Sequence, residues 1–334
     1  MKINLRSIAQ TLPDIGEEHL FPVRRVREMA ELDRRGQHTL VDDPDQADLI
    51  LFVESLHWDS PAGAYFEQIA ADPVYRRHRA KTFLHSGTDW PVPIVRGIYP
   101  SIEKRYYSRS RARSGCYIAP PNPFLAEFSQ IAGRSQLRYL ASFVGCAGRT
   151  PARLNMLKVR DPSLLITDNT ESFVAALRSG DQGQVDAAKR QFIEVAAQSR
   201  FILCPRGYGT SSFRIFESME MGRAPVIISD QWVEPPGPDW SSFAIRIAER
   251  DIPRLADLLR PLEARFEEKG RLARQAWEQW FSPDVLFHHL VEDCAAIMRG
   301  TAPEWATRWT AHLQLLRPMH LKRRLQAIKR RMGR

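Results

Sequence analysis

Short apolar runs alternate with helix-compatible segments along most of the chain, and this alternation restricts the possible folds more than any other feature. The runs have the length and apolar character of buried strands. They are residues 49–54, 82–85, 93–99, 137–145, 163–168, 201–205 and 224–229. Parallel strands need a crossover, usually a helix, between them. The pattern therefore predicts an α/β fold in which parallel sheets are wound with helices, in two halves.

The domain organisation follows from the length and from one interruption of the pattern. A chain of 334 residues is long enough for two ordinary domains. The alternation breaks near residues 120–135, where PPNPF and a short polar stretch occur. We therefore predict an N-terminal domain over residues 1–130, a second domain over residues 131–300 and a helical basic tail over residues 301–334.

Neither the N-terminus nor the cysteines indicate an exported protein. The first residues lack the charged-then-apolar order of a signal peptide, and no run approaches the twenty or so apolar residues that span a bilayer. Cys116, Cys146, Cys204 and Cys294 are scattered and form no CxxC pair, so neither a disulfide framework nor a zinc site is indicated. A cytoplasmic protein with buried free thiols is expected.

The positive charge is concentrated in the tail. The formal net charge is +9, and residues 319–334 contain seven Lys and Arg and no acid, so the rest of the chain is nearly balanced. This distribution argues against nucleic acid as a partner. Leu321, Leu325, Ile328 and Met332 recur at helical spacing. Such a helix either lies on an anionic membrane surface or docks on the fold with its basic face in water.

The segment FILCPRGYGTSSFRIFESMEMGRAPVIISD, residues 201–230, has the character of an anion site. A buried strand ends at Pro205, and Gly207 and Gly209 permit a tight turn with close backbone approach. Ser211 or Thr210 is expected to cap the helix that follows. The amide groups and the dipole at the start of that helix favour a negative charge.

The charged residues of the segment extend this interpretation to a nucleoside diphosphate. Arg206 precedes the turn and Arg214 lies one turn into the helix, so both can reach a phosphate. Ser211, Arg214 and Glu217 are three residues apart and share one side of the helix. Glu217 would repel a phosphate but can accept hydrogen bonds from ribose hydroxyls. The glycine pattern matches neither the phosphate loop of NTPases nor the dinucleotide fingerprint, which disfavours nucleotide hydrolysis and hydride transfer.

These residues resemble the core of exostosin-type glycosyltransferases. That family pairs C-P-R-G-x-G-x-x-S-x-R-x-x-E with P-V-I-x-S-D-x-W and a later E-x-D-I-P-x-L, and this chain has CPRGYGTSSFRIFE, PVIISDQW and ERDIPRL. YLASFVGCAGRTPAR is similar to the family's S-F-x-G strand with its following arginine. The resemblance covers roughly residues 135–260. It implies two facing Rossmann-like domains of the GT-B type, with the donor on the second and the acceptor on the first, and inversion at the anomeric carbon.

The residues and the resemblance assign the same donor site. The expected donor-binding residues are Arg149, Arg206, Gly207, Gly209, Ser211, Ser212, Arg214 and Glu217; a solvated loop arginine is the alternative for Arg149. Fixed arginines and amides can stabilise the leaving diphosphate, so no metal and no cofactor beyond the nucleotide-sugar co-substrate are expected. The D-x-D at Asp43-Pro44-Asp45 is interpreted as solvated acid.

Inversion calls for a base that deprotonates the acceptor hydroxyl. Glu54, His57 and Asp89 lie at predicted strand ends of the first domain and are the candidates; a helix cap or loop hydrogen bond is the alternative for each. Trp58 and Trp90 lie beside them and suit either a sugar ring or the core.

We therefore expect a cytoplasmic glycosyltransferase, held at the inner membrane face by its tail, that uses a nucleotide sugar and a glycan or lipid-linked acceptor. Two alternatives stay open at this point. One is a protein that binds anionic glycan or nucleic acid without turnover, and the other is a transferase fold that has lost catalysis.

Overall fold

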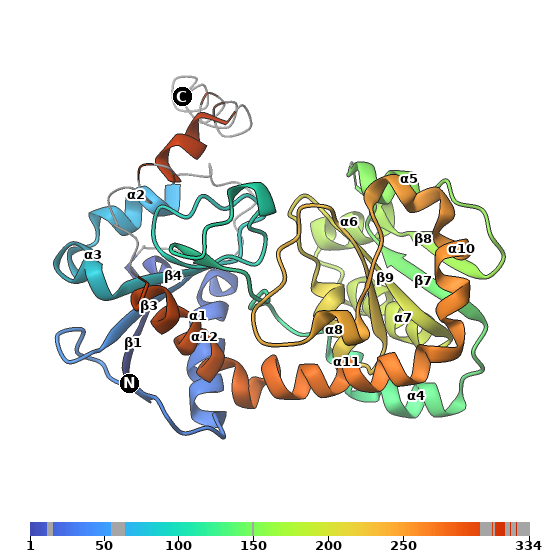
Figure 1. Ribbon diagram of the computed structural model, residues 1–334, viewed down its shortest axis with the longest axis horizontal. Coiled ribbons are helices and arrows are strands. Elements are labelled where there is room, and N and C mark those ends of the chain that lie inside the picture. Colours follow the sequence, from blue (N-terminus) through green and yellow to red (C-terminus); the bar gives the residue numbers. More distant parts are fainter. Residues whose placement is uncertain are drawn as a thin grey trace. The chain divides into compact units, whose positions relative to one another are not determined.

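The computed structural model describes residues 1–11, 16–54, 64–148, 150–300, 309, 311–317, 321 and 325. The chain forms two compact units (Figure 1). Unit 1 consists of Met1–Ala119, Val233–Pro236 and Pro283–Arg334, and unit 2 consists of Pro120–Trp232 and Gly237–Ser282. No helix in the described part of the chain combines the length and the apolar character needed to cross a bilayer.

Unit 1 is built on a parallel six-stranded sheet with the order β2-β1-β3-β4-β5-β6. Its strands are β1 (Lys2–Arg6), β2 (Thr39–Leu40), β3 (Leu49–Glu54), β4 (Thr82–Ser86), β5 (Gly97–Ile98) and β6 (Ala112–Arg113). All six residues of β3 are buried, as expected for a central strand covered on both faces.

Helices cover both faces of this sheet. They are α1 (Glu17–Leu32), α2 (Ala64–Ala71), α3 (Pro73–His78) and α12 (Pro283–Met298). On one face α1 packs on β3 and on α12, and α12 packs on β5 and β6. On the other face Ile69 of α2 and Tyr75 of α3 share a core with Ile50, Phe52 and Leu84.

Unit 2 is built on a parallel five-stranded sheet with the order β11-β10-β9-β7-β8. Its strands are β7 (Tyr139–Gly145), β8 (Leu164–Asp168), β9 (Ser199–Pro205), β10 (Ala224–Ile228) and β11 (Ile245–Arg246). Relative to chain order this is 2-1-3-4-5, the doubly wound arrangement in which the chain reverses direction between its first and third strands. Alternate residues of each strand therefore point to two covered faces.

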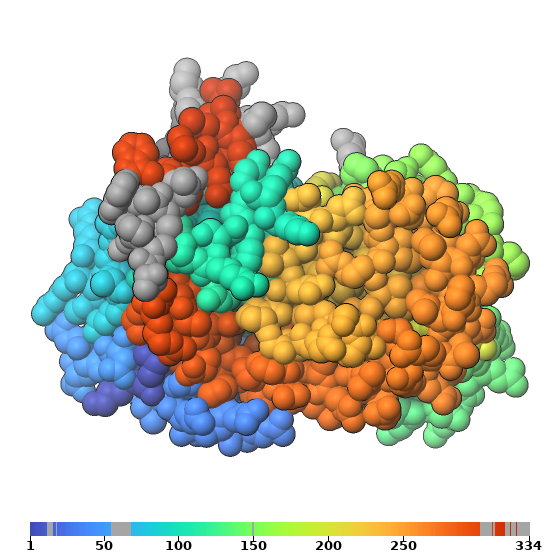
Figure 2. Space-filling model, viewed as in Figure 1, coloured from blue at the N-terminus to red at the C-terminus, as the bar shows by residue number. Residues whose placement is uncertain are grey.

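The helices of unit 2 divide between these faces. They are α4 (Phe128–Arg134), α5 (Pro151–Met156), α6 (Thr170–Ser179), α7 (Gln182–Ala197), α8 (Phe213–Glu220), α9 (Trp240–Phe243), α10 (Leu255–Leu259) and α11 (Phe266–Trp280), with the 3-10 helix η5 (Glu249–Arg254) before α10. α5 and α10 share one core with the strands. α7 and α8 pack against β7, β9 and β10, with α11 against α8. Figure 2 shows the α9–α11 segment, in orange, over much of the visible surface of unit 2.

The predicted α/β fold class with two parallel sheets is confirmed. The division of the chain differs in detail from the prediction: unit 2 begins at Pro120 instead of residue 131, and α12 belongs to unit 1 instead of the second domain. The reason is that Val285, Phe287 and Leu290 of α12 are buried in unit 1. In the tail, the described residues are helical except Arg317. All four cysteines are free, with Cys146 half-buried and the others buried.

Candidate functional site

The strand order of unit 2 places two predicted site loops next to each other. β8 and β9 both follow β7 along the chain but lie on opposite sides of it. The loop after β7 and the loop after β9 therefore emerge side by side at the carboxyl edge of the sheet. Ligands of doubly wound folds bind at this switch point.

The loop after β9 leads directly into a helix. The Arg206 amide donates to the Ile228 carbonyl at 3.0 Å, which continues the pairing of β9 with β10 by one residue. The helix α8 then begins at Phe213 with Ser212 as its N-cap. The prediction that Ser211 or Thr210 caps this helix is wrong, because the backbone is still extended at Ser212, whose side chain makes no capping hydrogen bond. The first amides of a helix lack intrahelical partners, so α8 directs donors toward this edge.

Arg153, which the sequence analysis did not single out, ties the two loops together. It lies in α5, whose N-cap is Thr150. Its guanidinium donates to the Cys146 carbonyl at 2.5 Å, to the Arg206 carbonyl at 3.2 Å and to the Pro205 carbonyl at 3.4 Å. A signal was present in the sequence, because Arg153 lies in the helical segment that follows the loop after the SFVG strand, close to the same edge of the sheet.

The contact with Arg153 also gives Gly207 its physical reason. A Cβ atom at Gly207 would lie 3.2 Å from Nη2 of Arg153. Neither Gly207 nor Gly209 has a positive φ angle. At Gly207 the need is thus for space beside a guanidinium rather than for an unusual turn conformation.

Arg214, in the first turn of α8, reaches back to the end of β7. Its Nη2 donates to the Val144 carbonyl at 2.7 Å, and its guanidinium lies 4.8 Å from the ring centroid of Phe143 and 5.4 Å from that of Phe192. A Cβ atom at Gly145 would be only 1.9 Å from the same Nη2. Arg214 is therefore a structural link between α8 and β7 as well as a positive charge below the loops.

Glu217 lies one turn further along α8. Burial raises the pKa of its carboxyl above the usual value, although the positive charges of Arg214 and Lys189 act in the opposite direction. The side chain is still partly exposed. Whether protonated or ionised, such a carboxyl can accept a hydrogen bond from a hydroxyl group.

Arg206 turns toward the β10 side of the loop. Its Nη2 donates to the Tyr208 carbonyl at 3.1 Å, and its Nη1 lies 3.8 Å from Oε1 of Glu249. Glu249 also accepts from the Asp230 amide at 3.3 Å. Arg206 and Arg214 therefore point to different sides of β9, and Arg153 lies against the loop between them.

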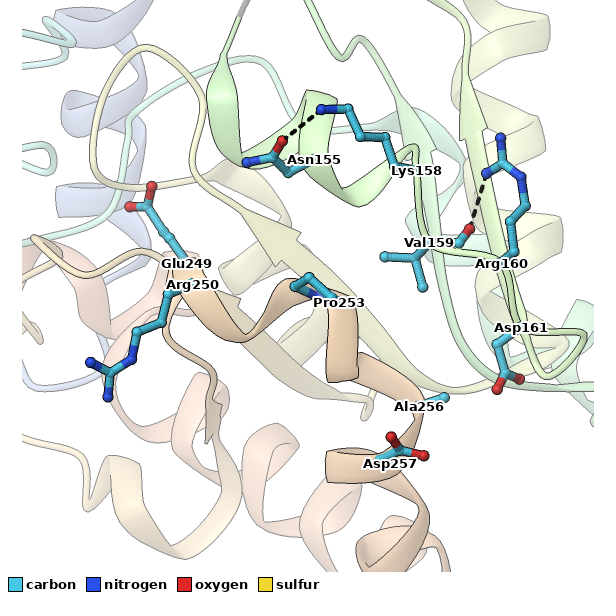
Figure 3. A pocket seen from close by; sticks show the side chains of 10 residues that line it. All are labelled: Asn155, Lys158, Val159, Arg160, Asp161, Glu249, Arg250, Pro253, Ala256 and Asp257. Carbon is cyan, nitrogen blue, oxygen red and sulfur yellow. Dashed lines mark hydrogen bonds between the residues drawn. The ribbon is translucent and has the colours of Figure 1, made fainter.

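A groove of about 560 Å³ begins at Glu249 and runs between α5 and the η5–α10 segment (Figure 3). Six of its ten lining residues are charged, so it is a polar groove. The lining residues are Asn155, Lys158, Val159, Arg160, Asp161, Glu249, Arg250, Pro253, Ala256 and Asp257. Two of the lining cations are engaged locally, because Lys158 donates to Asn155 and Arg160 to the Val159 carbonyl.

The structure brings together all but one of the predicted donor-binding residues. Arg206, Gly207, Gly209, Ser211, Ser212, Arg214 and Glu217 belong to a single strand–loop–helix unit at the carboxyl edge. Arg149 lies outside the described residues.

In unit 1, two of the three candidate bases can be placed. Glu54 ends β3 with 1% of its surface exposed, and it accepts hydrogen bonds from the Ser7 hydroxyl at 3.0 Å and the Ile8 amide at 2.7 Å. Burial raises its pKa to about 7 in spite of these two bonds. Both oxygens of Glu54 are thus engaged in joining β3 to the residues after β1.

Asp89 is more accessible than Glu54. It is half-buried and accepts a hydrogen bond from the Tyr117 hydroxyl at 3.0 Å, and Tyr117 is itself hydrogen-bonded to Ser101. Trp90 beside it is also half-buried. His57 and Trp58 lie outside the described residues.

The D-x-D residues lie before β3, at the opposite end of that strand from Glu54. Asp45 forms an ion pair with Arg77 at 3.1 Å and lies 2.7 Å from Nε2 of His78, and Asp43 accepts from the Asp45 amide. Within the part of the chain that the structure describes, no three His, Cys, Asp or Glu side chains are grouped so that they could hold a metal ion.

Comparison with known proteins places the carboxyl-edge site inside a family domain. Residues 101–262 match the Exostosin GT47 domain. The chain is 36% identical over 105 residues to the Exostosin-1 homolog of Caenorhabditis elegans. This alignment covers 30% of this chain and 28% of the C. elegans protein. It is 35% identical over 101 residues to a probable glucuronosyltransferase of Oryza sativa subsp. japonica, Os01g0926400, covering 29% of this chain and 23% of that one.

The alignments with these two curated relatives therefore span less than a third of each relative's own length. Among solved structures, a glycosyltransferase from Rickettsia africae ESF-5 covers 90% of this chain and aligns over 99% of its own length, at 10% identity and a TM-score of 0.37. The domain match and the curated relatives agree in one respect: residues 101–262 are similar to the exostosin GT47 domain, and the matched relatives are named exostosins and probable glycosyltransferases.

Proposed function

We propose that the protein is a glycosyltransferase that binds a nucleoside diphosphate sugar at the carboxyl edge of unit 2 and transfers the sugar to a hydroxyl acceptor. The observation that carries the proposal is the pair of loops after β7 and β9, which meet at the switch point, are tied by Arg153 and lead into the start of α8 within the exostosin domain. This arrangement suits a diphosphate because amides, a helix dipole and arginines are held there before any ligand arrives.

Each donor-site residue has a distinct role in this proposal. The first amides of α8 and the Arg206 guanidinium bind the diphosphate, and Glu217 accepts from a ribose hydroxyl. Arg153 is a positioning residue that holds the loop after β7 and the loop after β9 next to each other. As the sugar–phosphate bond breaks, the same fixed donors stabilise the negative charge on the departing nucleoside diphosphate, so that no metal ion is needed.

We assign the general base to Asp89. Glu54 is buried with both oxygens engaged, whereas Asp89 is half-buried. In an inverting transfer, the acceptor oxygen attacks the anomeric carbon on the face opposite the leaving diphosphate, and its proton passes to the base. The Tyr117 hydroxyl donates to one oxygen of Asp89.

The donor sugar and the acceptor are proposed at the level of chemical class. Relatives named as glucuronosyltransferases favour a hexosyl or glucuronosyl donor. The acceptor is a hydroxyl group of a glycan or of a lipid-linked sugar.

A thermal-shift screen against UDP, GDP, CMP and dTDP, each with and without EDTA, tests the donor site, because a ligand that binds only the native state raises the melting temperature. We expect one nucleoside diphosphate to raise the Tm in both conditions. A shift that disappears in EDTA would contradict metal independence. Absence of any shift would contradict the donor site.

Two variants and one matched control then locate the site. Arg206→Ala and Arg153→Lys are expected to weaken nucleotide binding roughly tenfold or more, because each removes charge-assisted hydrogen bonds. Arg160→Lys is the control, since Arg160 donates only to the carbonyls of neighbouring residues. Equal affinity in all three variants would show that the nucleotide binds elsewhere.

The assignment of the base is tested by sugar transfer or by slow hydrolysis of the bound donor. Asp89→Asn is expected to bind the nucleotide normally and to lose turnover. Nucleotide binding without any turnover by the unaltered protein would favour a non-catalytic binding protein instead.

A further inference from the structure

Exposed apolar side chains are concentrated at the C-terminal end of the described chain. Eleven large hydrophobic side chains are exposed in the described residues, and five of them lie beyond residue 300, where only ten residues are described. These five are Trp309 (68% exposed), Leu313 (57%), Leu316 (62%), Leu321 (41%) and Leu325 (59%). A cluster of this kind marks an interaction surface, whereas single exposed leucines need no explanation.

The same segment is fastened to unit 1 by its other side chains. Ala311 and Leu315 are buried in a small core with Ile94. Arg317 forms an ion pair with Glu103 in which both side chains are nearly buried, and its guanidinium lies 4.1 Å from the ring centroid of Tyr106. The two alternatives for the tail, docking on the fold and binding a surface, are therefore compatible: one set of residues docks and another remains exposed.

Two of the exposed residues, Leu313 and Leu316, line a groove in unit 1. Tyr106 and Tyr107 also line this groove, which has a volume of about 540 Å³. Arg105, Arg111 and Arg317 also line this groove. Apolar, aromatic and cationic side chains thus occur together in one place.

The charge of the segment indicates what covers this surface. Residues 305–334 contain nine Lys and Arg and no Asp or Glu. An anionic bilayer satisfies both features, because its headgroups attract the cations and its interfacial region accepts Trp and Leu side chains. A nucleic acid would pair with the cations but would leave the leucines in water.

We propose that Trp309, Leu313, Leu316, Leu321 and Leu325, which belong to a segment rich in Lys and Arg, form a docking surface for an anionic lipid bilayer. Ala311, Leu315 and Arg317 fix this surface to unit 1. The proposal is independent of sugar transfer, and it places the protein where a lipid-linked acceptor would be found.

The experiment is co-sedimentation of the full chain with vesicles of phosphatidylcholine alone or of phosphatidylcholine mixed with phosphatidylglycerol, at low and high salt. We expect binding to the mixed vesicles, weak binding to the neutral ones and a loss of binding at high salt. Equal binding to both kinds of vesicle would contradict the electrostatic part of the proposal, and no binding to the mixed vesicles would overturn it.

A triple variant tests the apolar part. Trp309→Ala, Leu313→Ser and Leu316→Ser together are expected to weaken binding to the mixed vesicles by about tenfold, since interfacial binding scales with buried apolar area. The matched control carries Leu32→Ser, Leu154→Ser and Leu177→Ser, which alter three leucines of 54%, 40% and 57% exposure outside the tail. The control should bind like the unaltered protein.

Other partners give different results in the same assays. If light scattering shows a dimer that the triple variant dissociates, while no vesicle binding occurs, a second copy of the chain covers the surface. If a DNA or RNA oligonucleotide binds and the triple variant binds it equally well, the tail is a nucleic-acid site. Either result would overturn the proposal.

Discussion

Two arginines at the carboxyl edge of unit 2 bind backbone carbonyl groups and also provide positive charge. Arg153 donates to carbonyls at the ends of β7 and β9, and Arg214 donates to the end of β7 from α8. An arginine bound to carbonyl oxygens is pre-positioned, so a ligand meets a fixed positive field and pays less for ordering side chains. The sequence motif could predict the residue types but not these contacts, because they depend on which strands are neighbours.

Gly145→Ala is the residue-scale test of this arrangement. The new methyl group would collide with the Arg214 guanidinium, 1.9 Å from Nη2, so Arg214 must leave the Val144 carbonyl. We expect a loss of about 1–3 kcal/mol in stability and weaker nucleotide binding. Gly133→Ala is the control, because a Cβ at that helical position meets nothing within 4 Å. Thermal unfolding and nucleotide titration measure both effects; an unchanged Gly145→Ala protein would contradict the assigned contact.

At the scale of elements, the sequence predicted the long apolar strands, including the edge strand β8, but missed β1 and the two-residue strands β2, β6 and β11. The runs that became β3, β7, β9 and β10 are long and apolar because helices cover both of their faces. The edge strands β2, β6 and β11 contain only two residues each, too few for a period to be visible. The residues of the proposed donor site could be predicted together because they lie on one continuous segment. The base was not, because its candidates are distributed over separate loops.

Glu54 joins β3 to the residues after β1, and its raised pKa makes this connection sensitive to pH. With a pKa raised from 4.5 to about 7, folded Glu54 keeps its proton between these values while the unfolded chain releases it. The contribution of the neutral carboxyl to the free energy of unfolding is therefore fully present below pH 4.5, and it is lost as the pH rises through 7. The total loss is roughly 3 kcal/mol at about 1.4 kcal/mol per pH unit.

The Gln variant provides the reference, since Glu54→Gln cannot ionise at this position. An amide can still accept from the Ile8 amide and can donate to the Ser7 hydroxyl. We expect the Tm of the unaltered protein to fall by several degrees relative to that of the variant between pH 4.5 and pH 8. A constant difference across this range would mean that Glu54 does not titrate there.

At the scale of the whole molecule, the chain leaves unit 1 after Ala119, contributes the short segment Val233–Pro236 to unit 1 while it builds unit 2, and returns at Pro283 to finish unit 1. A boundary drawn from local pattern assigns α12 to the nearer domain in sequence, as the prediction did. The buried face of α12 instead packs on α1 and on β5 and β6 of unit 1. Residues that are distant in sequence thus complete the core around the first sheet. This packing cannot be predicted from any short stretch of the sequence.

Two core truncations test this assignment without requiring a ligand. Leu290→Ala in α12 and Leu259→Ala in α10 each remove a buried side chain and should cost about 2–5 kcal/mol. Hydrogen exchange reports where stability is lost, because amides of a destabilised unit open more often. We expect Leu290→Ala to accelerate exchange in β1, β3 and β4 but not in β7, β9 and β10, and Leu259→Ala to do the reverse. Faster exchange in β9 and β10 with Leu290→Ala would assign α12 to unit 2 instead.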